Sequence, residues 1–197
     1  MSAQERRARE RAQRHQLIID TARTLAESAG WDAVTTRRLA DEIEYSQPVL
    51  YSHFQNKEAI VQAVALDGFA KLAETLRTAR KGGGSSAAAL RRVARAYTDF
   101  ALTRPALYDA MFALSTDLTF GDEDTPEPLR DAFGELRAVV GEPGGKYDID
   151  TYTEVVWSAL HGLTSLTRTG RLRVDHHAEQ LELLLLRFAP APPAKTR

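Results

Sequence analysis

The spacing of apolar residues along this 197-residue chain is the feature that most constrains its fold. Apolar side chains recur three and four residues apart, and no stretch shows the sustained two-residue alternation of a half-buried strand. Alanine, leucine, arginine and glutamate, all good helix formers, dominate the sequence. The pattern therefore predicts an all-α protein.

Glycines mark the two clearest breaks between the predicted helices. Gly30 is expected to end a first helix over about 13–29, because glycine adopts the left-handed conformation of helix ends without a Cβ penalty. Glycines and serines at 82–86 end a long helix that begins after Asn56 and runs for roughly 24 residues, or about 36 Å. The sequence thus predicts a small N-terminal module, a long connecting helix and an all-helical body.

The stretch between Gly30 and Asn56 predicts two more helices. Thr35 or Thr36 can cap a short second helix, and Ser46 a third, because hydroxyl side chains satisfy the free N–H groups at a helix start. Pro48 falls in the first turn of the third helix, where its missing N–H does little harm. Two short helices joined by a tight turn form a helix-turn-helix.

The third helix combines a core face with a polar tip. Leu50 and Phe54 are four residues apart and are expected to face the core. In a helix-turn-helix, the N-terminal residues of the second helix contact base edges in the major groove of DNA. Gln47 can bond an adenine edge bidentately, and Pro48 can contact a thymine methyl group. The third helix is therefore the predicted recognition helix.

Other polar residues are predicted to bind the DNA around this tip. Tyr51, His53 and Lys57 supply hydrogen-bond donors for flanking phosphates, and Arg37 can contact a guanine or a phosphate. The net charge of −1 does not by itself favour nucleic acid, but residues 1–16 carry five arginines against two glutamates. We expect residues 1–12 to form a flexible basic arm that follows the backbone or enters a minor groove.

Residues 34–62 resemble the DNA-binding signature of the TetR family of transcriptional regulators. The shared pattern is Thr-Thr-Arg-x-hydrophobic-Ala, a short turn, and then Leu-Tyr-x-His-Phe-x-x-Lys-Glu. In this chain the pattern is filled by Thr35, Thr36, Arg37, Leu39, Ala40, Leu50, Tyr51, His53, Phe54, Lys57 and Glu58. The resemblance implies a helix-turn-helix DNA-binding domain over 13–60 and an all-helical ligand-binding and dimerisation domain over 61–189. About nine helices are implied in all. The tail over 190–197 is too rich in proline to continue the last helix and is expected to be disordered.

The resemblance also assigns roles to individual residues. By this resemblance, Arg37, Gln47 and Pro48 fall on positions that contact bases. The complete predicted DNA site consists of Thr35, Thr36, Arg37, Ser46, Gln47, Pro48, Tyr51, His53 and Lys57. Its partner would be double-stranded DNA with a palindromic operator.

A local pattern in the body resembles a TetR subgroup named for a Trp-His-Gly signature, here Trp157, His161 and Gly162. The family's ligand pocket lies in the body, and an unidentified small molecule would be the effector. Candidate lining residues are Tyr97, Phe100, Tyr108, Met111, Phe112, Trp157 and His161. Aromatic residues and methionine at helical spacing are also what an ordinary core contains, and His161 is expected as a hydrogen-bonded structural histidine rather than a catalyst or metal ligand.

The last two predicted helices, over about 148–169 and 176–188, are the expected homodimer interface. The second contains Leu-Glu-Leu-Leu-Leu-Leu-Arg-Phe, which is apolar around more of its circumference than a solvent-facing helix needs. A large exposed apolar stripe usually marks a partner surface, and a twofold four-helix contact would bury it. Burial in the core of the monomer is the alternative.

Composition and motifs argue against several other classes of protein. The chain contains no cysteine, which excludes disulfides and suits a cytoplasmic location. No window approaches the roughly 20 apolar residues of a membrane helix. The Gly-x-Ser-x-Gly, His-Glu-x-x-His and Gly-x-Gly-x-x-Gly motifs are missing. We therefore expect a cytoplasmic protein that is not an enzyme, does not bind a membrane and needs no metal or cofactor.

Two functions remain in view. The first is a ligand-responsive transcriptional regulator, most simply a repressor that a small molecule releases from its operator. The second is a helical small-molecule-binding protein that has lost specific DNA recognition. The turn position often filled by glycine in the family is Glu44, where a positive φ would cost about 1 kcal/mol. Val49 replaces the usual Thr or Ser and would remove one phosphate contact.

Overall fold

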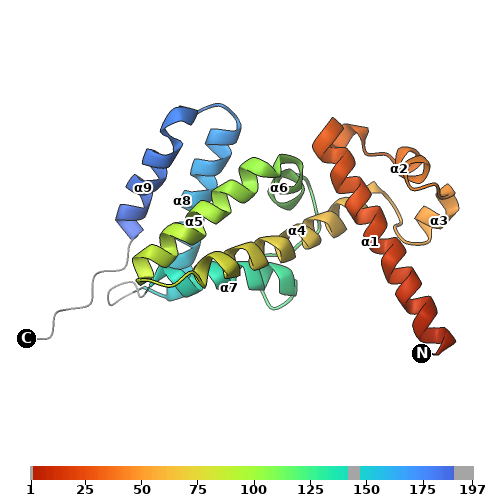
Figure 1. The fold of residues 1–197 in the computed structure, drawn as a ribbon, viewed down its shortest axis with the longest axis horizontal. Helices are drawn as coiled ribbons and strands as arrows, with labels where there is room; N and C mark the ends of the chain where they lie inside the picture. The colour runs from red at the N-terminus through yellow and green to blue at the C-terminus, as the bar shows by residue number, and fades with distance from the viewer. Residues whose placement is uncertain (1, 142–146, 189–197) are drawn as a thin grey trace, which may run out of the picture. The chain divides into compact units, whose positions relative to one another are not determined.

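The structure is a computed structural model that describes residues 2–141 and 147–188. Within these residues, the chain forms nine α-helices and two short 3-10 helices and contains no strand (Figure 1). The α-helices are α1 (Ala3–Ala29), α2 (Thr36–Glu42), α3 (Gln47–Tyr51), α4 (Lys57–Arg80), α5 (Ser86–Thr103), α6 (Pro105–Phe112), α7 (Glu127–Val140), α8 (Ile149–Arg168) and α9 (His177–Phe188). The all-α prediction is confirmed. The predicted tail over 190–197 lies outside the described residues.

The chain divides into two compact units. The first unit comprises Met1–Gly68 and Arg104–Thr125, and the second comprises Phe69–Thr103 and Pro126–Arg197. The boundary falls inside α4, so both units contain part of this helix. α6 belongs to the same compact unit as the N-terminal helices. The expected boundary after residue 60 between a DNA-binding and a ligand-binding domain stays a prediction.

Side-chain contacts from α1 and its following turn explain why α6 belongs to the first unit. The Glu27 carboxylate accepts hydrogen bonds from the backbone N–H groups of Ala106 and Leu107, at 3.1 and 3.0 Å. Glu27 thereby caps α6 at two N–H groups that have no carbonyl partner within the helix. The indole N–H of Trp31 donates to the Ala106 carbonyl at 2.8 Å.

Gly68 allows a close approach between α4 and α6. A Cβ atom at this position would lie 2.7 Å from Met111 Sδ and 2.9 Å from Leu107 Cδ1. Both neighbours are buried, so a side chain at position 68 would force Met111 or Leu107 to shift within the core. The crossing of these two helices therefore depends on a residue without a side chain.

The first helix begins earlier than the sequence analysis expected. α1 starts at Ala3 and not at about residue 13, so residues 3–12, expected as a flexible basic arm, are helical. Ser2 Oγ accepts from the Glu5 N–H at 3.2 Å, and the Glu5 carboxylate accepts from the Ser2 N–H at 2.7 Å. This reciprocal capping box satisfies two free donors at the helix start.

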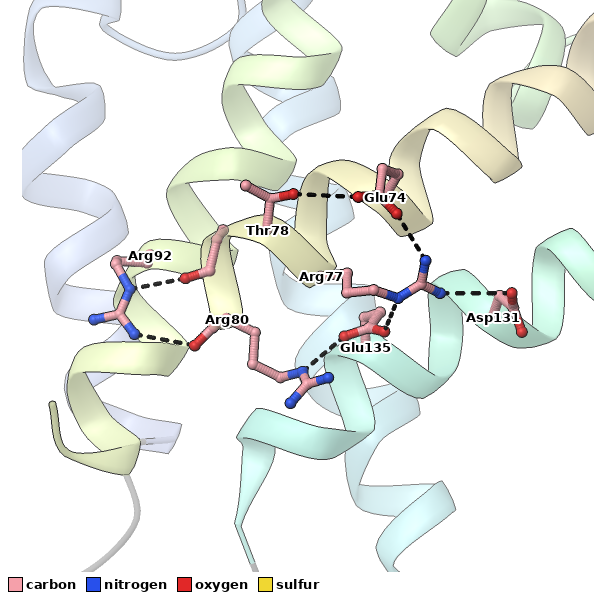
Figure 2. A network of polar contacts seen from close by, with 8 residues as sticks. Glu74, Arg77, Thr78, Arg80, Arg92, Asp131 and Glu135 are labelled. Carbon is pink, nitrogen blue, oxygen red and sulfur yellow. Dashed lines mark hydrogen bonds and ion pairs between the residues drawn. The ribbon is translucent and has the colours of Figure 1, made fainter. Parts of the chain in front are cut away.

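In the second unit, α5 packs against α7, α8 and α9. Its core contains the fully buried Tyr97, Leu160 and Phe100. The C-terminal half of α4 is joined to α7 by an ion-pair network (Figure 2). There, Glu135 is 8% exposed and accepts from Arg77 Nε at 2.9 Å and from Arg80 Nε at 2.7 Å.

The same network satisfies the end of α4. Arg92 on α5 donates to the Ala79 carbonyl at 2.8 Å and to the Arg80 carbonyl at 3.2 Å (Figure 2). These carbonyls belong to the last turn of α4, where intrahelical donors run out. In the parts of the chain that the structure describes, no helix has the length and hydropathy needed to cross a membrane.

Candidate DNA-binding site

The turn between α2 and α3 is closed by backbone hydrogen bonds. The Tyr45 N–H donates to the Ala40 carbonyl at 2.9 Å, and the Glu44 N–H donates to the Asp41 carbonyl at 3.3 Å. This is the Schellman arrangement, which needs a left-handed residue directly after the helix cap. Glu44 fills that position with φ of 56°, the only positive φ of a non-glycine residue in the described chain. Glu44 therefore has the positive φ that the sequence analysis considered for this turn position.

Capping side chains set where the neighbouring helices begin. Thr35 Oγ1 accepts from the Arg38 N–H at 3.2 Å and is the N-cap of α2. Asn56 Oδ1 accepts from the Ala59 N–H at 2.8 Å at the start of α4. Ser46 occupies the N-cap position of α3, but its hydroxyl makes no capping bond. All three positions match the predicted helix starts.

The two faces of α3 differ as the sequence pattern requires. Leu50 is 0% exposed and Phe54, just beyond the helix, is 5% exposed, so both lie in the core. Gln47 and Pro48, at the first turn, are exposed. The side chains of Gln47 and Pro48 are therefore available to contact a groove of DNA.

Tyr51 lies at the other end of α3. Its side chain is 49% exposed, and its hydroxyl lies 3.3 Å from Thr36 Oγ1, within hydrogen-bond distance. This contact joins the start of α2 to the end of α3. Arg37, which follows Thr36 in the first turn of α2, is exposed.

His53 stands next to a second histidine from α1. The ring of His15 stacks on Phe54 with centroids 4.4 Å apart and lies 6.1 Å from the ring of His53. Burial lowers the pKa of His53 below its ordinary value, and the positive charges of His15, Arg11 and Arg14 lower it further. A neutral imidazole still has one N–H donor, so His53 can bond a phosphate without adding charge.

Lys57, at the start of α4, is already engaged within the protein. Its ammonium group donates to the Trp31 carbonyl at 2.6 Å, and its side chain is half-buried. An ammonium group has three donors, so two remain for a phosphate.

The sequence analysis missed two residues at this surface. Arg38 follows Arg37 in the first turn of α2 and is exposed. His15 supports Phe54 and His53 from α1. The charge of Arg38 could have been noticed from the sequence, whereas the role of His15 depends on tertiary packing.

The candidate ligand-binding residues fall in both compact units. Tyr108, Met111 and Phe112 belong to α6 in the first unit, and the first two are buried. The other four belong to the second unit and are Tyr97, Phe100, Trp157 and His161. The burial of four of the seven is what an ordinary core would also give.

Three of these residues form a hydrogen-bonded chain between α5 and α8. The Trp157 indole N–H donates to the Tyr97 hydroxyl at 3.0 Å, and this hydroxyl lies 3.3 Å from His161 Nδ1. His161 Nε2 lies 3.2 Å from Ser165 Oγ. Burial, and then the charge of Arg168, lowers the pKa of His161. A neutral ring with its hydrogen on Nε2 satisfies these contacts, with Tyr97 donating to Nδ1.

The comparisons with known proteins agree with this geometry. Residues 18–64 match the family model described as bacterial regulatory proteins, tetR family, and residues 90–188 match the tetracyclin repressor-like C-terminal domain. The chain therefore belongs to the TetR family of transcriptional regulators. Members of this family bind DNA, act as dimers and are transcription factors, not enzymes.

Individual relatives resemble different lengths of the chain. An uncharacterized HTH-type transcriptional regulator of Mycobacterium tuberculosis is 30% identical over 157 residues, which are 78% of this chain and 69% of that protein. The tetracycline repressor protein class C of Escherichia coli is 46% identical over 48 residues, 24% of this chain and 22% of that repressor. A solved structure from Rhodococcus sp. RHA1 has a TM-score of 0.71 at 23% identity, over 89% of this chain and 94% of that one. Its similarity shows the shared fold alone.

Proposed function

We propose that the protein is a ligand-responsive repressor that binds a palindromic operator in the cytoplasm as a homodimer and is released by a small molecule. The observation that carries this proposal is the exposure of Gln47 and Pro48 at the tip of α3, above a buried Leu50. In a dimer, the two α3 helices would enter major grooves about one helical turn apart, on the order of 34–36 Å. Bound there, the protein would exclude RNA polymerase.

The proposed contacts divide into those that select a sequence and those that position the protein. Gln47, Pro48 and Arg37 are exposed and are assigned to base edges. Phosphates are assigned to the remaining polar groups of the site, which are Thr35, Thr36, Ser46, Tyr51, His53 and Lys57. Phosphate contacts fix the register of the protein on the duplex but carry no sequence information.

The proposed dimer interface consists of α8 and α9. Exposed apolar side chains lie on both helices, with Val155 and Leu166 on α8 and Leu183 and Leu186 on α9. Leu183 and Leu186 are 57% and 64% exposed, although leucine normally favours burial. A Cβ added to Gly162 would meet no atom within 4 Å in this chain. This open space on α8 suits the close approach of a helix from a second copy.

The proposed effector acts on the second unit. Trp157 and His161 are the predicted ligand residues of that unit that remain partly exposed. The proposed transmission runs through α4, because this helix contributes residues to both units. Only a ligand with different affinities for the DNA-bound and released states can shift the equilibrium between them.

Two residues favour the alternative function, that of a helical small-molecule-binding protein without specific DNA recognition. Glu44 holds a strained conformation and brings a carboxylate to the turn before α3. Val49 offers no hydroxyl for a phosphate. Against this alternative, the turn is still closed by its full set of hydrogen bonds and the tip of α3 is still exposed.

A fluorescence-anisotropy titration separates the two functions. Duplexes recovered by genomic pull-down are titrated with the protein over a range of salt concentrations, alongside a shuffled duplex of the same composition. A regulator binds the recovered duplex more tightly than the shuffled one, with an affinity that falls steeply with salt. Equal, weak binding to both duplexes would favour the alternative.

A further inference from the structure

Arginines line one side of the first turns of α1. Arg7, Arg11 and Arg14 are four and three residues apart and therefore share a helix face. At 3.6 residues per turn, all three point within about 40° of the direction of Ile18. Ile18 is the first buried residue of α1. Arg7, Arg11 and Arg14 therefore extend, toward the N-terminus, the same face of α1 that is buried at Ile18. We call these three residues the arginine row.

The guanidinium groups of this row are available to a partner. Residues 2–14 are all exposed. Within the described parts of the chain, no ion pair or hydrogen bond engages Arg7, Arg11 or Arg14. By contrast, Arg6 points to another side of α1 and lies 4.0 Å from Glu10.

The row ends beside the candidate DNA-binding site. His15 directly follows Arg14, and its ring lies against Phe54 and 6.1 Å from His53, just after α3. The pKa of His53 is lowered by burial and, in addition, by the charges of His15, Arg11 and Arg14. The row is therefore on the side of α1 that carries the recognition helix.

A row of this length matches the spacing of charge on duplex DNA. The seven residue-to-residue steps of helix from Arg7 to Arg14 span about 10 Å. One DNA strand carries a negative charge for about every 3.4 Å of duplex axis, so roughly three phosphates occupy the same length. Because the segment is helical, its arginines present one fixed face, which suits a backbone better than the interior of a narrow minor groove.

We propose that Arg7, Arg11 and Arg14 bind the DNA phosphates beside the half-site occupied by α3, with α1 acting as a rigid strut along the backbone. This inference rests on the proposed DNA-binding function. It replaces the flexible arm by an oriented surface, so the effect of removing an arginine depends on its helix face.

Two double variants with the same change in charge test the face dependence. Arg7→Gln with Arg11→Gln removes two charges from the row, and Arg6→Gln with Arg9→Gln removes two charges from other sides of α1. Anisotropy titrations use the duplex recovered by genomic pull-down and its shuffled counterpart. The row variant is expected to bind both duplexes on the order of tenfold more weakly at 0.15 M salt, with a log–log salt slope smaller by about 1.8. The other variant keeps the parent affinity to within about twofold.

The outcomes separate this inference from the proposed function. Equal weakening in the two variants would mean that only the total charge of α1 matters, and no weakening in either would mean that the row does not reach DNA. Either result overturns the inference while leaving the regulator intact. A parent protein that shows no preference for the recovered duplex over the shuffled one would instead refute the proposed function.

Discussion

The Trp157 indole donates a 3.0 Å hydrogen bond to the hydroxyl of Tyr97, a residue with no exposed surface. The same hydroxyl lies 3.3 Å from His161 Nδ1. An internal hydroxyl group thus joins α5 to α8 inside the second unit. Removal of this one oxygen atom would therefore take a hydrogen-bond partner from both Trp157 and His161.

Tyr97→Phe is expected to destabilise the protein while keeping the packed ring. The change removes an acceptor from Trp157 and a partner from His161, which costs about 1–3 kcal/mol of unfolding free energy for buried polar groups. Urea denaturation measures this loss. Tyr147→Phe is the control, because Tyr147 is 74% exposed and its hydroxyl faces water. Equal stability of the two variants would contradict the role assigned to Tyr97.

The stability of the fold is expected to fall as the pH drops below about 6.5. Burial lowers the pKa of His161, and burial also heads the causes that lower the pKa of His15 and His53. The unfolded chain therefore binds more protons than the folded chain between the lowered pKa values and 6.5, so stability increases with pH across that window. Above about pH 6.5, the full stability is present.

Urea midpoints measured from pH 5 to pH 7.5 test this dependence. His161→Gln should reduce the pH slope in part, and His15→Gln with His53→Gln should reduce the remainder. A parent protein whose midpoint is constant over this range would show that the histidines are not held neutral by the fold.

Gln47 and Lys57 are expected to affect DNA binding in different ways. Gln47→Ala should cost about 1–3 kcal/mol at one base position and relax specificity there. Lys57→Ala should weaken binding to all sequences similarly, because its proposed contact is to phosphate. Titrations against a set of single-base operator variants distinguish the two patterns. If Lys57→Ala changed base preference and Gln47→Ala did not, the two assigned roles would be reversed.

Glu44→Gly is expected to stabilise the helix-turn-helix. Glu44 has φ of 56°, and glycine adopts this conformation without the Cβ penalty of about 1 kcal/mol. Glu44→Ala is the matched control, since it removes the carboxylate but retains the Cβ. Urea denaturation should therefore show a gain for glycine over alanine. If alanine gave the same gain, the carboxylate and not the backbone would be the source of the penalty.

Leu183→Glu and Leu186→Glu are each expected to disrupt dimerisation. Burying a leucine contributes about 1.5–3 kcal/mol, so each change should weaken the dimer by at least about tenfold. Sedimentation equilibrium measures the effect, and operator affinity should fall with it. Leu102→Glu is the control, because Leu102 is 40% exposed on α5, outside the proposed interface. A dimer unaffected by both α9 changes would place the interface elsewhere.

Local sequence features predicted the helix boundaries well. The cap at Thr35, the cap at Asn56 and the stop at Gly30 act over three or four residues, and the structure contains all three. The early start of α1 was also encoded locally, because Ser2 and Glu5 have the spacing of a capping box. That signature was overlooked in a segment whose charge suggested a flexible arm.

Contacts between distant residues could not be predicted from such features. Glu27 caps α6 across 79 residues of sequence, and no local rule connects the two. In the same way, the bond between Lys57 and the Trp31 carbonyl, and the stacking of His15 on Phe54, arise only when the helices pack. Residue types therefore predicted a candidate DNA site, while tertiary packing determined how each of these side chains is held.

The absence of a side chain at Gly68, where α4 packs against α6, has a consequence for how homologous sequences diverge. A methyl group at this position would lie 2.7 Å from Met111 Sδ, so a larger residue in α4 requires Met111 in α6 to shift or to be replaced by a shorter residue. Positions 68 and 111 are therefore expected to vary together among homologues, with alanine or serine at 68 accompanied by a smaller residue at 111. Such paired replacements would record, in sequence, a helix contact that neither residue reveals alone.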